Sequence, residues 1–205
     1  MLSRSQAKLD AARRTVEGNA VAIAMDMVDR GAVDRAIGGL GKLDHLVLTA
    51  VADELARRAP ITELNDDQVE RSFDKLRGFV NVVRAGVPNL AERGSITMVM
   101  GASAVKPPRD GFSLLAAEGG ALISFGKALA LELSPRRVNV LMSGVVDTPI
   151  NAERRDEMKA WAESPALPAR RFGQAEDIAD GILFLMNNPY ATGQMLTVDG
   201  GYSAT

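Results

Sequence analysis

The stretch SLLAAEGGALISFGKALALELSPRRVNVLMSGVVDTPI, from Ser113 to Ile150, decides the fold. Its first half has the length of a helix over 114–133 and is apolar almost all round, which predicts burial on most sides. Four leucines fall near one face of this helix: Leu115, Leu122, Leu129 and Leu133. Residues 137–142 then read as a buried strand, and Asp147-Thr148-Pro149 opens another helix. A helix, a buried strand, a turn and a helix in this order indicate an α/β protein.

The same alternation continues along the whole chain. Hydrophobic periodicity predicts strands at 20–27, 44–50, 95–100, 137–142 and 194–198. Periodicity and capping residues predict helices at 3–17, 28–40, 65–87, 114–133, 151–162 and 175–187. Strands that alternate with helices favour a mostly parallel sheet flanked by helices. No repeat, linker or low-complexity tract divides the sequence, so residues 1–205 are interpreted as a single domain.

Composition excludes several classes of function. The chain has 205 residues, a net charge of -2, no cysteine and one histidine. The charge disfavours a nucleic-acid partner, and the lack of cysteine and histidine argues against a metal site. No apolar run reaches the roughly 18 residues that span a bilayer, so no membrane association is expected. The charged N-terminus lacks the apolar core of a signal peptide, so a cytoplasmic location is expected.

Three motifs give the chain a family resemblance. ALALEL, RVNV and SGVVDTPI, within residues 128–150, resemble the late segment of short-chain dehydrogenases/reductases. KLDHLVLTA, at 42–50, resembles the fourth strand of that family, which lines the cofactor cleft. FGQAEDIADGILFLMNNPYATGQMLTVDGGY, at 172–202, resembles its C-terminal signature. The resemblance covers nearly the whole chain.

The resemblance implies a Rossmann-like, doubly wound sheet that lacks the family's first strand and glycine-rich turn. The second strand of the family is expected to end before Met1, so the residues that distinguish NAD from NADP are expected at or before that position. Gly38-Gly39-Leu40-Gly41 follows a predicted helix and is interpreted as its C-terminal cap rather than a phosphate-binding turn. The strand at 20–27 must therefore pair with 44–50 or find another partner.

The family's catalytic positions carry other residue types here. Counting back from ALALEL places its tyrosine at Leu115 and its lysine at Gly119, and its serine falls at Met100 or Gly101. The asparagine of its proton relay falls at Lys75, and a divergent branch of short members also has lysine there. Lys75 is either a group that stabilises an anionic substrate or developing alkoxide, or a solvated helix lysine. Ser103 is either a substrate anchor or a loop serine.

The resemblance implies NADP or NAD as cofactor and assigns it a set of binding residues. Asp26 corresponds to the acidic residue beside the adenine ring, although a strand-end turn former is the alternative. Thr49, Ala50 and Val51 are expected to line the cleft near a ribose, because loops after parallel strands bind ligands. Four further residues are expected to face the nicotinamide amide: Ser143, Gly144, Val146 and Thr148. His45 is interpreted as a structural histidine.

Two functions remain open from the sequence. The first is an NAD(P)-dependent oxidoreductase that acts on a small carbonyl or alcohol, and the second is a non-catalytic scaffold or regulatory homologue. A start site upstream of Met1 is a further alternative. The family resemblance implies a homodimer or homotetramer through the helices at Asn65–Val87 and Leu114–Leu133. Four residues of the first helix are candidates for that surface: Phe79, Val80, Val83 and Val87.

Overall fold

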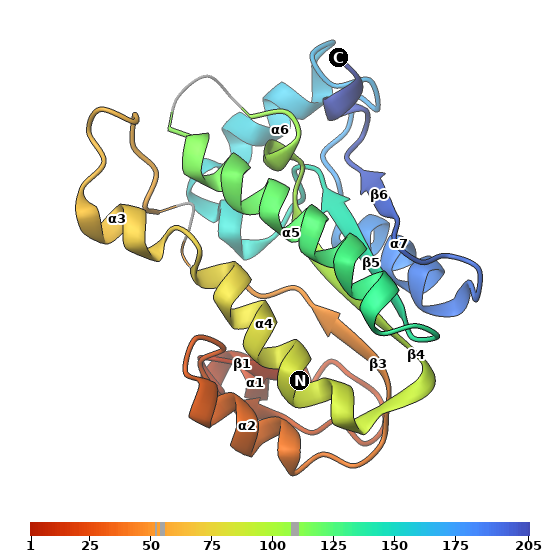
Figure 1. The fold of residues 1–205 in the computed structure, drawn as a ribbon. Coiled ribbons are helices and arrows are strands. Elements are labelled where there is room, and N and C mark those ends of the chain that lie inside the picture. The colour runs from red at the N-terminus through yellow and green to blue at the C-terminus, as the bar shows by residue number, and fades with distance from the viewer. Residues whose placement is uncertain (52, 54–55, 108–110) are drawn as a thin grey trace.

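The predicted α/β architecture is confirmed by the computed structural model, which describes residues 1–205 except 52, 54–55 and 108–110 (Figure 1). The strands are β1 (Leu2–Ser3), β2 (Ile23–Ala24), β3 (Leu43–Leu48), β4 (Leu90–Gly101), β5 (Arg137–Ser143) and β6 (Met195–Val198). The α-helices are α1 (Gln6–Arg13), α2 (Arg30–Gly38), α3 (Asp66–Arg71), α4 (Asp74–Gly86), α5 (Ser113–Glu132), α6 (Arg155–Glu163) and α7 (Ala175–Asn187). Short 3₁₀ helices are η1 (Val87–Asn89), η2 (Ala102–Ala104), η3 (Pro149–Arg154) and η4 (Tyr202–Ala204).

A four-stranded sheet in the order β3-β4-β5-β6 forms the centre, and all of its pairings are parallel. Successive side chains of β5 contact opposite helix layers, as the two-residue period of a strand requires. A Cβ on Gly126 of α5 would lie 2.7 Å from Val140, whereas a Cβ on Gly181 of α7 would lie 2.7 Å from Leu141. Figure 1 shows α4 and α5 on one face of the sheet and α7 on the other.

The expectation that no strand precedes residue 20 is wrong, because the chain begins with a short strand. Leu2–Ser3 is itself a strand, whereas the second strand of the family was expected to end before Met1. It pairs in parallel with β2, so β2 finds its partner here and not in β3. The helix predicted at 3–17 is shorter as a result: Ser5 caps α1 by accepting the N–H of Lys8. Arg4, directly after β1, pairs with Asp53 beyond the end of β3 at 2.8 Å.

The single helix predicted at 65–87 is divided into α3 and α4. In a continuous helix the N–H of Lys75 would bond to the carbonyl of Arg71. Instead, the Arg71 carbonyl accepts a hydrogen bond from the Arg57 guanidinium at 2.9 Å. The Lys75 N–H donates to the carboxylate of Glu118 on α5 at 3.1 Å. Two side chains from elsewhere in the chain thus replace one helical hydrogen bond, which local periodicity does not reveal.

Smaller differences occur at other boundaries. The helix predicted at 151–162 begins as the 3₁₀ helix η3 and becomes α-helical only at Arg155. Strand β4 starts at Leu90 and is longer than predicted. Helix α7 has the predicted bounds. His45 forms a 2.8 Å hydrogen bond between its Nδ1 and the hydroxyl of Ser95, in agreement with a structural role.

Helix α5 is buried on one face and exposed on another. By length and composition it is apolar enough to cross a membrane, as core helices of globular domains also are. Leu115, Leu122 and Leu129 are buried, as predicted, whereas Leu131 is 83% exposed. The sheet-facing half is therefore covered within this chain, whereas cover of the other half by a second subunit stays a prediction.

A glycine-to-alanine change tests how closely α5 approaches the loop after β4. A methyl group on Gly119 would lie 2.1 Å from the Cβ of Ala104 and 3.0 Å from the Sδ of Met100. We expect Gly119→Ala to lower the free energy of unfolding by about 1–3 kcal/mol, because overpacking outweighs the gain in helix propensity. Chemical denaturation measures the change.

The matched control is Gly38→Ala in α2, where a methyl group would meet nothing within 4 Å. That variant should be neutral or up to about 1 kcal/mol more stable. Equal effects of the two substitutions would contradict the close approach at Gly119.

Candidate functional site

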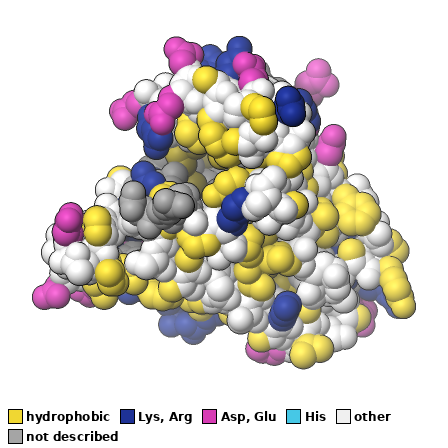
Figure 2. Space-filling view, turned by 90° about the horizontal axis from the view of Figure 1, so that it is seen from above, with side chains coloured by type: hydrophobic (Ala, Val, Ile, Leu, Met, Phe, Trp, Pro, Cys, Tyr) yellow, Lys and Arg dark blue, Asp and Glu magenta, His cyan; other side chains and the backbone are white. Residues whose placement is uncertain are grey.

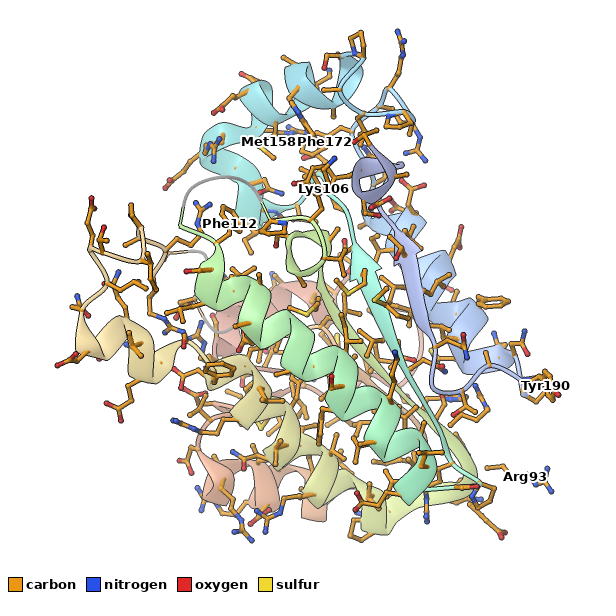
Figure 3. All side chains as sticks on the ribbon, turned by 45° about the horizontal axis from the view of Figure 1, so that its top comes forward. Arg93, Lys106, Phe112, Met158, Phe172 and Tyr190 are labelled. Atoms are coloured by element: carbon orange, nitrogen blue, oxygen red, sulfur yellow. The ribbon has the colours of Figure 1, made fainter. Side chains whose placement is uncertain are left out.

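The loops after β3, β4 and β5 all leave the sheet at its carboxyl edge, where parallel sheets bind their ligands. Figure 2 looks onto this end of the molecule and shows a hollow with hydrophobic side chains along its wall. Figure 3 places Lys106, Phe112, Met158 and Phe172 at the same end.

The positions of the family's tyrosine and lysine hold no group that exchanges protons. Leu115 is buried and lines a small pocket together with Arg57, Gln68 and Ser72. At Gly119, Ala104 and Met100 fill the space that a side chain would need. A lysine therefore does not fit at this position unless η2 moves.

Lys75 is a buried cationic residue on α4, the helix that packs beside α5. It is the second residue of α4 and only 5% exposed, so the interpretation as a solvated helix lysine is wrong. Its ammonium lies 5.7 Å from the ring centroid of Phe79, which is itself fully buried. A cation over an aromatic face is stabilised by the ring quadrupole.

Glu118 is a buried acidic residue beside Lys75 that sequence reasoning did not assign to the site. It is 0% exposed, and its Oε1 accepts the N–H groups of Lys75 at 3.1 Å and Leu76 at 3.2 Å. The signal in the sequence was its position: Glu118 lies three residues after Leu115, on the buried face of an apolar helix. An acidic residue on such a face needs polar partners.

Asp74 is a second buried carboxylate, but its charge is matched by arginines. Arg57, Arg71 and Arg77 approach its carboxylate oxygens at 3.6, 3.3 and 3.2 Å. One of these arginines, Arg71, also lies 3.9 Å from the carboxylate of Asp67. The ion pairs of Asp74 therefore hold the three arginines around the first turn of α4.

Ser103 lies in η2 and is half buried. A Cβ on Gly101 would lie 3.3 Å from its hydroxyl, so the side chain turns back toward the end of β4. Its neighbour Ala104 contacts Gly119 on α5. The structure thus brings Ser103 to the same end of α5 as Glu118, although no described hydrogen bond joins Ser103 to Lys75.

The predicted cofactor-binding residues all follow carboxyl ends of strands. Asp26 accepts the N–H of Val28 at 2.9 Å, which is the bond of a turn former. Thr49, Ala50 and Val51 are exposed directly after β3. Ser143 is the last residue of β5, and the residues that follow it are buried or half buried: Gly144, Val146 and Thr148. Thr148 precedes η3 without capping it.

The segment 147–172 forms a lid over this edge. Its two ends are joined by a parallel bridge between Val146 and Gly173. Arg155 on the lid pairs with Asp147 at 2.5 Å. An apolar cluster within the lid, which includes Leu167 and Phe172, packs against Val145 and Tyr202. The lid is therefore anchored at its base and held together by its own apolar side chains.

Neither tyrosine is placed as a proton donor. The side chain of Tyr190 is 97% exposed to solvent. The Tyr202 hydroxyl donates to the carbonyl of Lys106 at 2.9 Å, and its ring packs edge-on against Trp161. Burial, and then the charge of Asp199, raises the pKa of Tyr202 above its ordinary value. In the part of the chain that the structure describes, no three His, Asp or Glu side chains gather as a metal site would require.

Comparisons with known proteins agree with this geometry. A family model described as Enoyl-(Acyl carrier protein) reductase matches residues 2–203. L-xylulose reductase from Bos taurus is 33% identical over 212 residues, which cover 100% of this chain and 85% of that protein. D-erythrulose reductase from Gallus gallus is 30% identical over 210 residues, covering 98% of this chain and 83% of that protein.

Among solved structures, a small-chain dehydrogenase in complex with NADPH shares the fold with a TM-score of 0.82 and 28% identity, covering 100% of this chain and 97% of that one. The similar curated proteins are reductases, so the alternative of a non-catalytic scaffold is not supported. The matched model, the relatives and the fold together show that this chain belongs to the short-chain dehydrogenase/reductase family, whose members are NAD(P)-dependent oxidoreductases.

Proposed function

We propose that this chain reduces a small carbonyl compound with NADPH and that Lys75 takes the role that a tyrosine has elsewhere in the family. The observation that carries the proposal is the burial of Lys75 at the start of α4, beside the carboxyl edge of the sheet. A buried ionisable side chain close to a ligand-binding edge is a candidate functional group. The reductase names of its relatives support the direction of the reaction.

Several groups at this edge fit an NADPH molecule. Hydroxyl groups for the ribose and the amide of the cofactor come from Thr49, Ser143 and Thr148. The guanidinium of Arg4 is proposed to bind the phosphate that NADPH carries and NADH lacks. Arg4 and Asp53 have side chains that are each 50% exposed, and Arg4 holds the pKa of Asp53 below its ordinary value. An exposed ion pair of this kind contributes only about 0–1 kcal/mol.

The chemistry then divides between cofactor and protein. Bound NADPH supplies the hydride that reduces the carbonyl carbon. The Ser103 hydroxyl donates a hydrogen bond to the carbonyl oxygen. The Lys75 ammonium stabilises the negative charge that develops on that oxygen and transfers a proton to it, and solvent returns the proton to Lys75. The lid over this edge excludes water from the bound substrate and so strengthens the interaction of Lys75 with the oxygen.

Replacing Lys75 with methionine tests this function. Lys75→Met keeps the apolar stem and removes the ammonium, so kcat for NADPH-dependent reduction of a panel of small ketones and ketoses should fall by about 100-fold or more. Loss of NADPH absorbance measures kcat, and calorimetry should show unchanged NADPH affinity. Full activity of the variant, or no turnover of any panel compound by the unaltered protein, would overturn the proposal.

The choice of NADPH over NADH is proposed to depend on Arg4. Arg4→Gln should raise KM for NADPH by about 10–100-fold, because a hydrogen bond between charged groups is worth about 1.5–3 kcal/mol, and should leave KM for NADH unchanged. Asp53→Asn is the control: it releases Arg4 from the ion pair and should leave KM for NADPH equal or lower. Equal changes with both cofactors would contradict the assignment.

A homo-oligomer through α5 remains a proposal. The exposed face of α5 carries mostly small and apolar residues, with one lysine among them: Ala117, Gly120, Ser124, Lys127, Ala128 and Leu131. Helix α4 contributes less than expected, since Phe79 and Val83 are buried in the core of this chain. Of the other candidates, Val80 and Val87 are only half buried. The cytoplasmic location likewise stays a prediction.

A charge on the exposed face of α5 tests the oligomer. Leu131→Glu should shift the protein from a dimer or tetramer to a monomer in light scattering, because a carboxylate in an apolar interface is strongly disfavoured. Val21→Glu, at a residue that is 59% exposed and outside this face, is the control. A monomeric unaltered protein would disprove the oligomer.

A further inference from the structure

The segment 199–205 follows β6, contains η4 and lies against the loop that carries Ser103. Figure 1 shows this end of the chain beside α6, the helix of the lid. Figure 3 places Lys106, which follows Ser103 by three residues, at the same end of the molecule. The segment therefore meets both the lid and the loop after β4.

Lys106 and Tyr202 exchange hydrogen bonds, each from its side chain to the backbone of the other. The Lys106 ammonium donates to the carbonyl of Tyr202 at 3.0 Å, and the Tyr202 hydroxyl donates to the carbonyl of Lys106 at 2.9 Å. The same ammonium lies 4.9 Å from the centroid of the Tyr202 ring and donates to the carbonyl and the hydroxyl of Thr205. Hydrogen bonds from a charged donor are stronger than neutral ones, so the ammonium fastens the segment to the loop.

The backbone of Lys106 also closes the turn in which Ser103 lies. The N–H of Lys106 donates to the carbonyl of Ala102 at 3.0 Å, and the N–H of Val105 donates to the same carbonyl at 3.0 Å. The carbonyl of Lys106 is the acceptor for the Tyr202 hydroxyl. A shift of Lys106 would therefore move this turn, and with it the hydroxyl of Ser103.

The segment is itself fixed to the lid. The carbonyl of Gly200 accepts the N–H of Ala169 at 2.9 Å. The ring of Tyr202 packs edge-on against Trp161 of α6, with the two centroids 5.8 Å apart, which is a geometry that aromatic pairs prefer. Tyr202 therefore contacts the lid with its ring and the loop of Ser103 with its hydroxyl.

We propose that the segment 199–205 is a strap that holds the turn of Ser103 against the lid, with Lys106 and Tyr202 as positioning residues. This inference rests on the proposed role of Ser103 as a hydrogen-bond donor to the substrate carbonyl. Such a donor is effective only when it is fixed in place before the reaction, and a small displacement lowers the rate by a large factor. Without the strap, the Ser103 hydroxyl is expected to spend part of its time out of reach of the substrate oxygen.

A kinetic double-mutant cycle tests whether the strap acts through Ser103. Lys106→Met removes the ammonium and keeps the apolar stem, so kcat for the panel of ketones should fall by about 5–10-fold, whereas KM for NADPH should stay within about twofold. In a Ser103→Ala background, Lys106→Met should have no further effect on kcat. Lys8→Met, at an exposed residue of α1, is the matched control. An unchanged kcat, or an equal loss in both backgrounds, would overturn the inference.

The fluorescence of Trp161, the single tryptophan of the chain, tests the contact of the strap with the lid. Tyr202→Leu removes the ring that packs against Trp161, so acrylamide should quench the fluorescence about twofold more strongly. Tyr202→Phe keeps the ring and should leave the quenching unchanged. Equal quenching in the unaltered protein and in Tyr202→Leu would show that the strap does not hold the lid.

Hydrogen exchange tests the strap without turnover. Tyr202→Phe removes only the hydroxyl, so the amides of Val105 and Lys106 should exchange about 10-fold faster, as measured by mass spectrometry on peptides that contain them. Tyr190→Phe, at the other tyrosine of the chain, is the matched control, because that side chain is exposed. Exchange at the same rate in both variants would contradict the strap.

The exchange experiment also separates a failure of this inference from a failure of the proposed function. Faster exchange in Tyr202→Phe would support the strap even if the unaltered protein reduces no compound of the panel, a result that overturns the proposed function alone. Normal turnover together with unchanged exchange in Tyr202→Phe would overturn the strap and leave the proposed function in place.

Discussion

The candidate site depends on an exchange of hydrogen bonds at the junction of α3 and α4. The Arg71 carbonyl bonds to Arg57, and the Lys75 N–H bonds to Glu118, in place of one bond within a continuous helix. Hydrogen bonds that involve a charged group contribute about 1.5–3 kcal/mol, against about 0.5–1.5 kcal/mol for a neutral one, so the exchange favours the broken helix. The break lets α4 begin with Asp74 and Lys75 on its buried face.

The fold could be predicted from the sequence because its signals are local and repeated. The buried strand β5 and the buried leucines of α5 both appear in the structure as the sequence indicates. The break between α3 and α4 could not be predicted, because its cause is a contact with Glu118, 43 residues further along the chain. Nor could the pairing of Leu2–Ser3 with β2, since two residues are too few to show a strand period.

The candidate site could be predicted only in outline. Counting from the motif ALALEL placed Leu115 and Gly119, and the family's proton-relay asparagine pointed to Lys75. The structure adds what surrounds each of them. The burial of Lys75 could not be predicted, because the local sequence around it resembles that of any helix start. Glu118 had a signal in the sequence, because it is a carboxylate on the buried face of an apolar helix. Its hydrogen-bond partners on α4 could be identified only from the structure.

The charged groups around α5 lie at positions different from those of the family pattern, although the fold is the same. In the family pattern a tyrosine and a lysine lie one turn apart on this helix. Here the two positions are apolar or empty, with Ala104 occupying the space beside Gly119. The cation stands instead on α4, and α5 contributes the anion, Glu118. Glu118 accepts the N–H groups of Lys75 and Leu76, so the carboxylate on α5 holds the first turn of α4, and with it the backbone of Lys75, against the apolar helix.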